Sequence, residues 1–425
     1  MSSLRRRRRR RQDAPQALHN IPKRGSRVSL SCRALVVLLV CPVFALAQEA
    51  TPTQSQPSAK EPVLQPRPAP APDSAPGLIQ LDVVVNAKPG APVSGLEQKD
   101  FTLLDNKKPQ NIVAFQALDT AAPAAAQLEV ILLHDLVNST FEQAAVTQQQ
   151  IVKFLQQNGG HLRYPTSIAL FAKDGLHIQP TAGIDGNHLA AQLNATVRAI
   201  GLSSTRLGEV ARFQTSLTTL LDIADNKAKS PARKILIWTG PGWPMLAGSK
   251  YTSSSQDRQR DFDAIVAVST RLREAQLALY SISSTSQTTL YTPGAPPGGI
   301  PYGMPSAEAP QQVRVTPNMT APVEGTSYKE FLKGVKSARQ ADAGYLALQV
   351  LAVQSGGRVL DLSNDLAGQI ASCIEDISPF YRISFVPDHA DHPDDYHDLR
   401  VEIAKPGLTA HTSTGFYNQP QNPQP

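Results

Sequence analysis

The stretch Leu128-Glu-Val-Ile-Leu-Leu-His-Asp135, followed by Leu136-Val-Asn-Ser-Thr140, decides the fold class that the sequence predicts. Residues 128–134 form a short, mostly apolar run, which is typical of a β-strand buried on both faces. From Thr140 to about Gln157 the apolar residues follow a helical period. They are Phe141, Ala144, Ala145, Ile151, Val152, Phe154 and Leu155. A buried strand that leads into an amphipathic helix is the unit from which helix-covered parallel sheets are built.

The same alternation continues toward the C-terminus. Further strands are predicted at 167–172, 234–239, 277–282, 359–362 and 381–386, and further helices at 188–199, 207–224, 257–275, 341–354 and 366–377. We therefore expect an α/β fold over residues 128–386, with a doubly wound, mainly parallel sheet flanked by helices. A low-complexity insertion rich in Pro, Gly, Ser and Thr interrupts it at 285–325.

Shorter β-patterns flank this α/β domain on both sides. Residues 78–86, 101–104 and 111–115 alternate as strands do and predict a small β-module at 78–118, which is too small to be stable without a neighbour. A C-terminal β-hairpin is predicted at 387–418, with strands at 399–404 and 408–411. We expect the N- and C-terminal strands to form one accessory β-module.

The N-terminus has the features of a Sec-type export signal. Seven arginines, Arg5 to Arg11, precede the 13-residue apolar segment Ala34–Leu46, and Ala45-Leu46-Ala47 fits a cleavage site before Gln48. Thirteen residues are too few for a good membrane anchor, although an uncleaved anchor stays the alternative. Residues 1–47 hold 11 of the 41 basic and one of the 35 acidic residues, so the rest of the chain has a net charge near −4. The basic run therefore predicts export, to the periplasm or the extracellular space, and not nucleic-acid binding.

The composition of two further segments predicts disorder. Residues 48–77 are rich in Pro, Ala, Gln and Ser and form a spacer, and residues 419–425 form a polar tail. Two of the three cysteines fall within 1–47, which leaves Cys373 alone and without an intramolecular partner. Because Cys373 lies in an apolar helical pattern, we expect a buried hydrophobic residue there.

The sequence contains no recognisable catalytic motif. Gly-x-Ser-x-Gly, His-Glu-x-x-His and Cys-x-x-Cys are all absent, so no catalytic residue is assigned and we do not expect an enzyme. Residues 387–398 hold three His and five Asp, which predicts a solvated acidic loop or, as the alternative, a transition-metal site. Trp243 follows the strand at 234–239 and is a candidate partner-binding anchor or else a packed aromatic.

An acidic residue directly after a buried strand, followed by hydroxyl residues and a helix, resembles the von Willebrand factor type A domain. In that family an Asp-x-Ser-x-Ser motif binds a divalent cation. The chain from Leu78 to Tyr417 more closely resembles the von Willebrand factor A-related proteins of acidobacteria. Three features carry the likeness: Gly95-Leu-Glu-Gln-Lys-Asp-Phe-Thr-Leu-Leu-Asp105 with Lys108-Pro-Gln-Asn-Ile112, Leu351-Ala-Val-Gln-Ser-Gly-Gly-Arg358, and Tyr381-Arg-Ile-Ser-Phe-Val-Pro387 with Gly415-Phe-Tyr417.

The resemblance implies a metal site that is incomplete in this chain. Asp135 matches the family aspartate and Ser139 the second serine, whereas Val137 stands in place of the first serine. Asn138 offers an amide oxygen as a substitute, and Thr205 is the candidate threonine of the second loop. The aspartate of the third loop is replaced by Gly240. Since Mg²⁺ and Ca²⁺ prefer several charged oxygen ligands, this set predicts weak binding at most. The alternative is that Asp135 caps the following turn or helix.

Three functions follow from these features. The first is an exported binding module of the von Willebrand factor A-related family, which engages a protein or a cell-envelope polymer through the loops at the strand ends. The second is an envelope scaffold, and the third is an extracytoplasmic hydrolase. We expect no stable membrane span after signal cleavage, and the oligomeric state stays open.

Overall fold

The computed structural model describes residues 77–87, 92–118, 128–179, 181–201, 207–248, 251, 254–283, 327–375, 377–388, 390 and 392–418. These residues all belong to one contact unit, Glu61–Pro425. The predicted signal at 1–47, the spacer up to residue 76, the insertion at 285–325 and the tail at 419–425 lie outside the described residues. No helix in the described part of the chain is long and apolar enough to cross a membrane.

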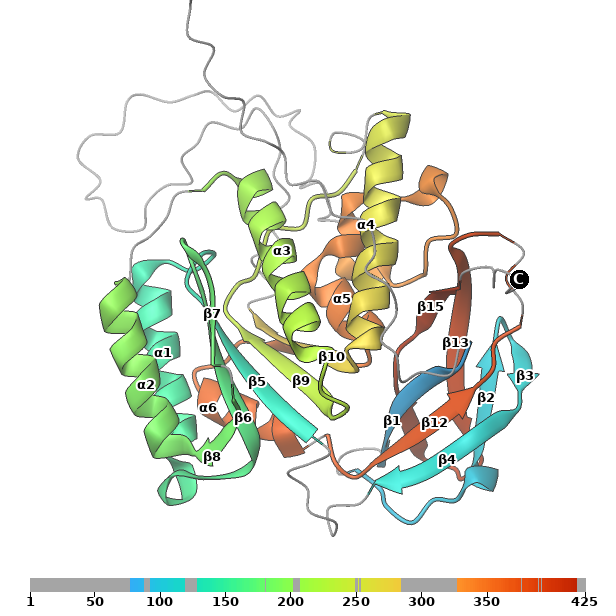
Figure 1. Ribbon diagram of the computed structural model, residues 1–425, viewed down its shortest axis with the longest axis horizontal. Helices are drawn as coiled ribbons and strands as arrows, with labels where there is room; N and C mark the ends of the chain where they lie inside the picture. The colour runs from blue at the N-terminus through green and yellow to red at the C-terminus, as the bar shows by residue number, and fades with distance from the viewer. Residues whose placement is uncertain are drawn as a thin grey trace, which may run out of the picture. The chain divides into compact units, whose positions relative to one another are not determined.

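The central sheet has the order β11-β10-β9-β5-β6-β7 and is mostly parallel, as expected (Figure 1). Its parallel strands are β5 (Leu128–Asp135), β6 (His161–Ala172), β9 (Arg233–Thr239), β10 (Leu277–Ser283) and β11 (Val359–Asp361). Two short strands that the sequence did not predict, β7 (Gly175–Ile178) and β8 (Gly183–Asp185), pair antiparallel with β6. The next strand after β5, β6, pairs with one side of β5, and the later strand β9 pairs with its other side. The strand order therefore reverses between β5 and β9.

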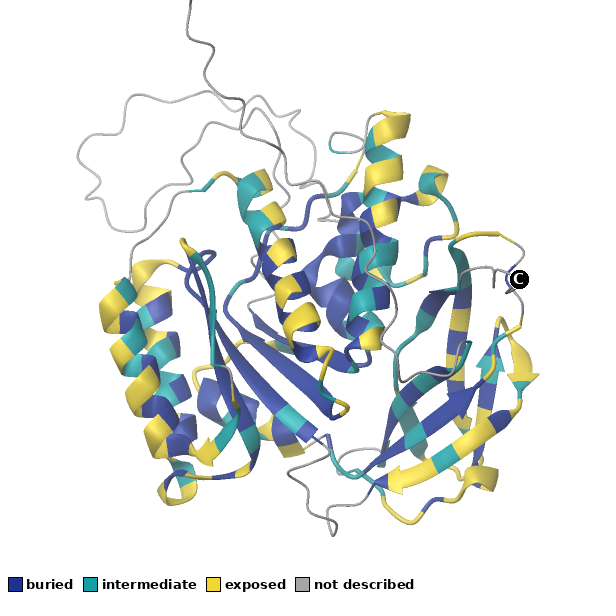
Figure 2. Ribbon diagram, in the orientation of Figure 1, coloured by how far each residue is buried: buried dark blue, intermediate teal, exposed yellow. Residues whose placement is uncertain are grey.

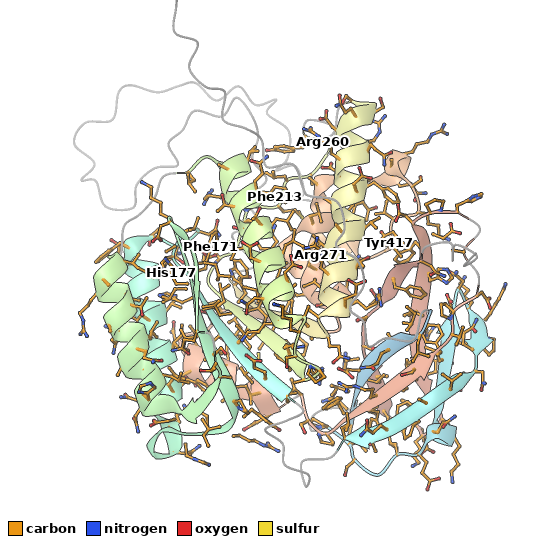
Figure 3. All side chains as sticks on the ribbon, in the orientation of Figure 1. Phe171, His177, Phe213, Arg260, Arg271 and Tyr417 are labelled. Carbon is orange, nitrogen blue, oxygen red and sulfur yellow. The ribbon has the colours of Figure 1, made fainter. Side chains whose placement is uncertain are left out.

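Helices cover both faces of this sheet. One face carries α1 (Phe141–Leu155), α2 (Gly186–Ile200) and α6 (Leu366–Glu375), and the other carries α3 (Glu209–Lys227), α4 (Ser255–Glu274) and α5 (Leu348–Gln354). Alternate residues of β5 belong to the two cores, because successive side chains of a strand point to opposite faces. Phe171, Phe213 and Tyr417 are part of the second core (Figure 3).

The long helix predicted at 341–354 was wrong in its first half. Residues 343–346 form a 3-10 turn, and α5 begins only at Leu348. The side chain of Asp342 accepts a hydrogen bond from the backbone N–H of Gly344 at 2.8 Å, and Ala347 is extended. An Asp side chain that binds the nearby backbone competes with helix formation in this way.

The accessory module consists of two antiparallel sheets, with the orders β14-β1-β12-β4 and β15-β13-β2-β3. The strands are β1 (Ile79–Ala87), β2 (Phe101–Asp105), β3 (Lys108–Gln110), β4 (Ile112–Leu118), β12 (Phe380–Phe385), β13 (Asp395–Ile403), β14 (Leu408–His411) and β15 (Gly415–Asn418). N- and C-terminal strands therefore do build this module together, as expected.

One domain assignment and one strand pairing that the sequence predicted for this part of the chain were wrong. The segment 381–386, which was placed in the α/β domain, forms β12 between β1 and β4. The strands predicted to pair as a C-terminal hairpin separate, because β13 pairs with β2 and β15 while β14 pairs with β1. Tyr381, Ile383 and Phe385 explain the first difference, since these alternate residues of β12 all pack into the core of the accessory module.

A buried charge cluster connects the accessory module to the central sheet. Asp82 on β1 accepts a hydrogen bond from the Nε of Arg382 at 2.9 Å, and its second oxygen lies 3.9 Å from the Nε of Arg233 on β9. Arg233 also donates to the carbonyl oxygen of Ile377 at 2.9 Å. Its guanidinium lies 4.9 Å from the ring centre of Phe380. Because buried charges are tolerated only when paired, this cluster fixes β1 and β12 against the end of β9.

Candidate functional site

The candidate site lies where the order of the parallel strands reverses. Asp135 is the last residue of β5, and Gly240 follows the last residue of β9, the strand beside it. In doubly wound sheets, ligands bind at the carboxyl ends of the strands on either side of such a reversal. The sheet thus brings Asp135, Asn138 and Ser139 together with Gly240 at the position where a binding site is expected.

Asp135 is fully buried, and four protein groups donate hydrogen bonds to its carboxylate. Oδ1 accepts from the backbone N–H groups of Val137 at 3.1 Å and Asn138 at 2.9 Å. Oδ2 accepts from the side-chain amide of Asn138 at 2.9 Å and from the indole N–H of Trp238 at 3.0 Å. Burial raises the pKa of this carboxyl, and the hydrogen bonds from Asn138 and Trp238 oppose that rise. Asp135 therefore organises the turn that connects β5 to α1.

Asn138 extends this network to the other side of the site. Its Nδ2 also donates to the Oγ of Ser216 on α3 at 3.0 Å, so the amide is oriented by two acceptors. Within the described part of the chain, the Oδ1 of Asn138 and the Oγ of Ser139 are buried without a hydrogen-bond partner. The sequence analysis missed Ser216 and Trp238. The available signal for Ser216 was a small hydroxyl residue between Phe213 and Leu217, two buried residues of α3.

Gly240 leaves no room for a side chain beside this network. Its φ of 137° is a backbone conformation that L-residues rarely adopt. A Cβ atom at this position would lie 2.8 Å from the Cβ of Asp135 and 3.4 Å from the Oγ of Ser139. At the position where the resembled family has an aspartate, the backbone of Gly240 therefore packs directly against Asp135 and leaves no space for a carboxylate side chain.

The described residues fit a hard dication poorly. Asp135 supplies the single carboxylate of the site, and both its oxygens already accept two hydrogen bonds each. Among the described residues, no group of three His, Cys, Asp or Glu side chains is placed to hold a metal ion. Thr205, the remaining predicted ligand, lies outside the residues that the structure describes. Mg²⁺ and Ca²⁺ require six or more oxygen ligands, and Asp135 would have to give up protein donors to become one of them.

Trp243 is not exposed, so it does not act as a surface anchor in this structure. Its side chain is 3% exposed, its indole N–H donates to the carbonyl oxygen of Leu346 at 3.0 Å, and its ring lies edge-on to Trp238 at 5.3 Å. Residues 240–244 thus fold this indole into the core that the sheet shares with α3, α4 and α5. The packed aromatic, which was the alternative, describes Trp243 correctly.

Other apolar side chains are exposed at the same end of the sheet. Phe141 at the start of α1 is 52% exposed, Val210 in the first turn of α3 is 50% exposed, and Leu362 directly after β11 is 47% exposed. The sequence pattern placed Phe141 in the buried stripe of its helix, and this was wrong. As the first residue of α1, Phe141 lies beyond the carboxyl end of β5, where the sheet no longer provides a face to cover it.

The His/Asp-rich segment is not a loop over its whole length. Its C-terminal part belongs to β13, where the Nδ1 of His397 lies 2.7 Å from the Oδ2 of Asp105 and both side chains are buried. The His397 ring stacks on Phe416 with the ring centres 4.6 Å apart. His389 and Asp391 lie outside the described residues. His397 is thus a core residue of the accessory module, because the alternation of β13 turns it inward.

Burial also controls the charge states of Cys373 and His134. Cys373 on α6 is buried, as expected, and burial raises the pKa of its thiol to about 12. His134 on β5 points to the face opposite Asp135, and a hydrogen bond with the backbone of Ala144 raises the pKa of its ring by less than burial lowers it. Burial lowers the pKa of His134 to about 4. Both side chains are therefore neutral at pH 7.

His134 should make the stability of the protein depend on pH. Between pH 6.5, near the pKa of an unfolded His, and pH 4, the unfolded state binds the proton and the folded state does not. The stabilisation is complete above this range and falls by about 3 kcal/mol as the pH decreases through it. Urea unfolding across this range should show that the unfolding free energy of the wild type decreases relative to that of His134→Leu as the pH is lowered. A pH-independent difference between the two proteins would contradict it.

Comparison with known proteins gives structural likenesses of low similarity. No protein-family model and no curated protein matches the chain. The solved structures that resemble it include the human COPII-coat protein Sec24c, with 6% identity, a TM-score of 0.29 and coverage of 70% of this chain and 44% of that one. The manganese-loaded Plasmodium vivax TRAP protein has 10% identity and a TM-score of 0.28, with coverage of 71% of this chain and 97% of that one. The pilus adhesin SpaC from Lactobacillus rhamnosus GG has 9% identity and a TM-score of 0.31, with coverage of 77% of this chain and 43% of that one. Likenesses at this level do not assign a function to the chain.

Proposed function

We propose that this chain is an exported binding module of the von Willebrand factor A-related kind, which engages a protein partner through the carboxyl ends of its parallel strands. The observation that carries the proposal is the arrangement at those ends. A turn held by Asp135 lies where the strand order reverses, and exposed apolar side chains lie at the same end of the sheet. This is the place where doubly wound sheets bind their ligands.

The exposed apolar residues favour a protein surface over a polysaccharide as the partner. Phe141, Val210 and Leu362 present large hydrophobic side chains to solvent, and such residues gather at protein interaction sites. In protein interfaces a few buried apolar or aromatic anchors supply most of the binding energy. A cell-envelope polymer would be recognised mainly through hydrogen bonds, for which these three side chains offer no groups.

Binding in this proposal does not depend on a tightly held metal ion. Four neutral protein donors occupy the carboxylate oxygens of Asp135, which would be the first ligands of a dication in the resembled family. The partner then contacts a preformed turn and the apolar residues beside it. The export signal expected at 1–47 would place this interaction outside the cytoplasm.

The proposal predicts that substitutions at the strand ends, and not elsewhere, abolish partner capture. Partners are captured from cell-envelope extracts on the immobilised protein and identified, and the affinity of the purified partner is then measured. Phe141→Ser and Val210→Ser should each weaken binding by about tenfold or more, since each removes an exposed anchor of about 1.4 kcal/mol or more.

Ile184→Ser is the matched control. Ile184 is also an exposed large hydrophobic residue, but it lies on β8, which pairs with the first half of β6 toward the opposite end of the sheet. Its substitution should leave the affinity unchanged. Loss of binding in Ile184→Ser together with full binding in Phe141→Ser and Val210→Ser would refute a site at the strand ends.

A further inference from the structure

The outer edge of β4 is an open sheet edge of unusual composition. β4 is the last strand of the sheet β14-β1-β12-β4, and no described strand pairs with its other side. Its sequence, Ile112-Val-Ala-Phe-Gln-Ala-Leu118, contains no charged residue and no proline. Val113, Ala114, Gln116 and Ala117 are exposed, and much of the β4 ribbon has the colour of exposed residues in Figure 2. Uncharged edge strands of this length are templates for pairing with another strand, because their outward N–H and C=O groups lack partners.

The other three edges of the accessory module are protected. β3 has only three residues, of which Lys108 is charged and Pro109 lacks an N–H group. β15 lies against α4, where Tyr417 packs edge-on to Phe262 with ring centres 6.0 Å apart. β14 has only four residues. Short strands, lysine, proline and a covering helix are the usual means by which proteins block edge pairing. β4 carries none of these four, although a bulge at Val113, another such feature, lies near its N-terminal end.

In the middle of β4 the side chains alternate between the two faces of its sheet, whereas at its C-terminal end Ala117 is exposed and Leu118 packs into the core beneath α1, α2 and α6. A bulge places one extra residue, Val113, between the pairs Ile112–Phe385 and Ala114–Ser384. As a result Ile112 and Phe115 both face the core, where Phe115 lies 5.2 Å from Phe101 between ring centres. Ala114 and Gln116 alternate with Phe115 and therefore point to the solvent face.

We propose that β4 is a dimerisation edge, which pairs antiparallel with β4 of a second copy of this chain about a two-fold axis at Phe115. In this register Ala114 lies opposite Gln116 of the second copy, and Phe115 lies opposite its own equivalent. Ala114, Phe115 and Gln116 of the two copies then stay on matching faces. No like charges meet, and the two phenylalanines form an aromatic cross-strand pair. The inference is independent of the strand-end site.

A second copy fits this edge better than the preceding segment of the chain does. Residues 61–76 carry proline at 62, 66, 68, 70, 72 and 76, so this segment cannot present the regular row of N–H donors that strand pairing requires. Pairing through one edge per copy also closes after two copies, whereas use of two different edges would lead to open fibres. Because one strand edge buries far less than the roughly 1,200–2,000 Å² of a stable interface, the dimer should be weak, with a Kd in the micromolar range or above.

Two charge variants test the edge and its register. In A114K/Q116K, lysine lies opposite lysine on both sides of the two-fold axis, so the dissociation constant should rise by about tenfold or more. In A114K/Q116E, lysine lies opposite glutamate, and dimerisation should return to within about threefold of the wild type. Both positions are exposed, so neither variant should disturb folding, which circular dichroism and the unfolding midpoint would verify. Val146→Lys, at an exposed hydrophobic residue on α1, is the control and should dimerise as the wild type does.

Sedimentation equilibrium of the purified protein over a wide concentration range gives the readout. Concentration-dependent dimers for the wild type and A114K/Q116E, with a monomeric A114K/Q116K, are the expected result. A monomeric wild type at the highest concentration would overturn the proposal. Equal association of all the variants would also overturn it, because the interface would then lie elsewhere. A monomeric A114K/Q116E would exclude the two-fold register at Phe115.

Discussion

Gly240→Asp should destabilise the protein and should not create a metal site. The substitution restores the carboxylate of the resembled family, but its Cβ would lie 2.8 Å from the Cβ of Asp135. The backbone at this position also has a φ of 137°, which costs a residue with a side chain about 1–3 kcal/mol. Crowding in a packed site adds about 1–3 kcal/mol. Urea unfolding should therefore show a loss of about 2–6 kcal/mol, and Mg²⁺ should not recover it.

A substitution at Gly248 separates the free-energy cost of backbone strain from the cost of side-chain crowding. Gly248 has a φ of 89°, and a Cβ atom there meets no atom within 4 Å. Gly248→Ala should thus cost only the backbone strain, whereas Gly240→Ala should cost strain and crowding together. If Mg²⁺ raised the unfolding midpoint of Gly240→Asp by several degrees and left the wild type unchanged, the site would have room for the carboxylate after all, and the packing described here would be contradicted.

Asp135→Ala should produce a loss of similar or larger size. It leaves four donors without their acceptor, namely the backbone N–H groups of Val137 and Asn138, the amide of Asn138 and the indole of Trp238. A buried donor without a partner costs about 1–3 kcal/mol, so the total should reach about 3–6 kcal/mol even if water replaces part of the carboxylate. Equilibrium unfolding in urea, monitored by the fluorescence of Trp238 and Trp243, measures this loss.

Asp174→Ala provides the comparison for a carboxylate that is not part of the network. Asp174 follows β6 at the same end of the sheet, is exposed, and contacts His177 at 2.9 Å. An exposed pair of this kind contributes between 0 and about 1 kcal/mol. Equal unfolding free energies for Asp135→Ala and Asp174→Ala would show that the four hydrogen bonds do not hold the turn.

The sequence predicted the parts of the fold that depend on local patterns. The apolar run at 128–134 identifies a strand buried on both faces, and the helical period after it identifies α1. Thr140 and Gln143 form a capping box that starts α1 within one residue of the expected position. Asp135 was found because an acidic residue directly after a buried strand is a local signal.

Features that depend on partners distant in the chain could not be predicted in this way. β12 has the alternation of any half-buried strand, and only its pairing with β1 and β4 places it in the accessory module. His397 belongs to a segment with the composition of a solvated loop, but Asp105, 292 residues earlier, gives it a buried partner. Ser216 and Trp238 reach the candidate site from α3 and β9, and no spacing in the sequence relates them to Asp135.

The exposure of Phe141 and the burial of Trp243 show the same limit at the functional surface. A helical period states which residues share a face, but not where the sheet beneath that face ends. Phe141 belongs to the apolar stripe of α1 and still lies beyond the end of β5. Trp243 follows a glycine-rich turn typical of a surface loop, and the turn folds it onto the core. Trp243, which the sequence offered as a surface anchor or else a packed aromatic, is therefore packed, whereas Phe141, which was assigned to the apolar stripe of its helix, is exposed.

Partner binding with and without divalent cations tests the strand-end site most directly. The affinity of a captured partner is measured for the wild-type protein in excess EDTA and in millimolar Mg²⁺, with Phe141→Ser as the negative control. We expect the two dissociation constants to agree within about twofold, because both oxygens of Asp135 already accept hydrogen bonds from protein donors. We expect Phe141→Ser to bind weakly in both buffers. Binding that is lost in EDTA and restored by Mg²⁺ would contradict a metal-independent site.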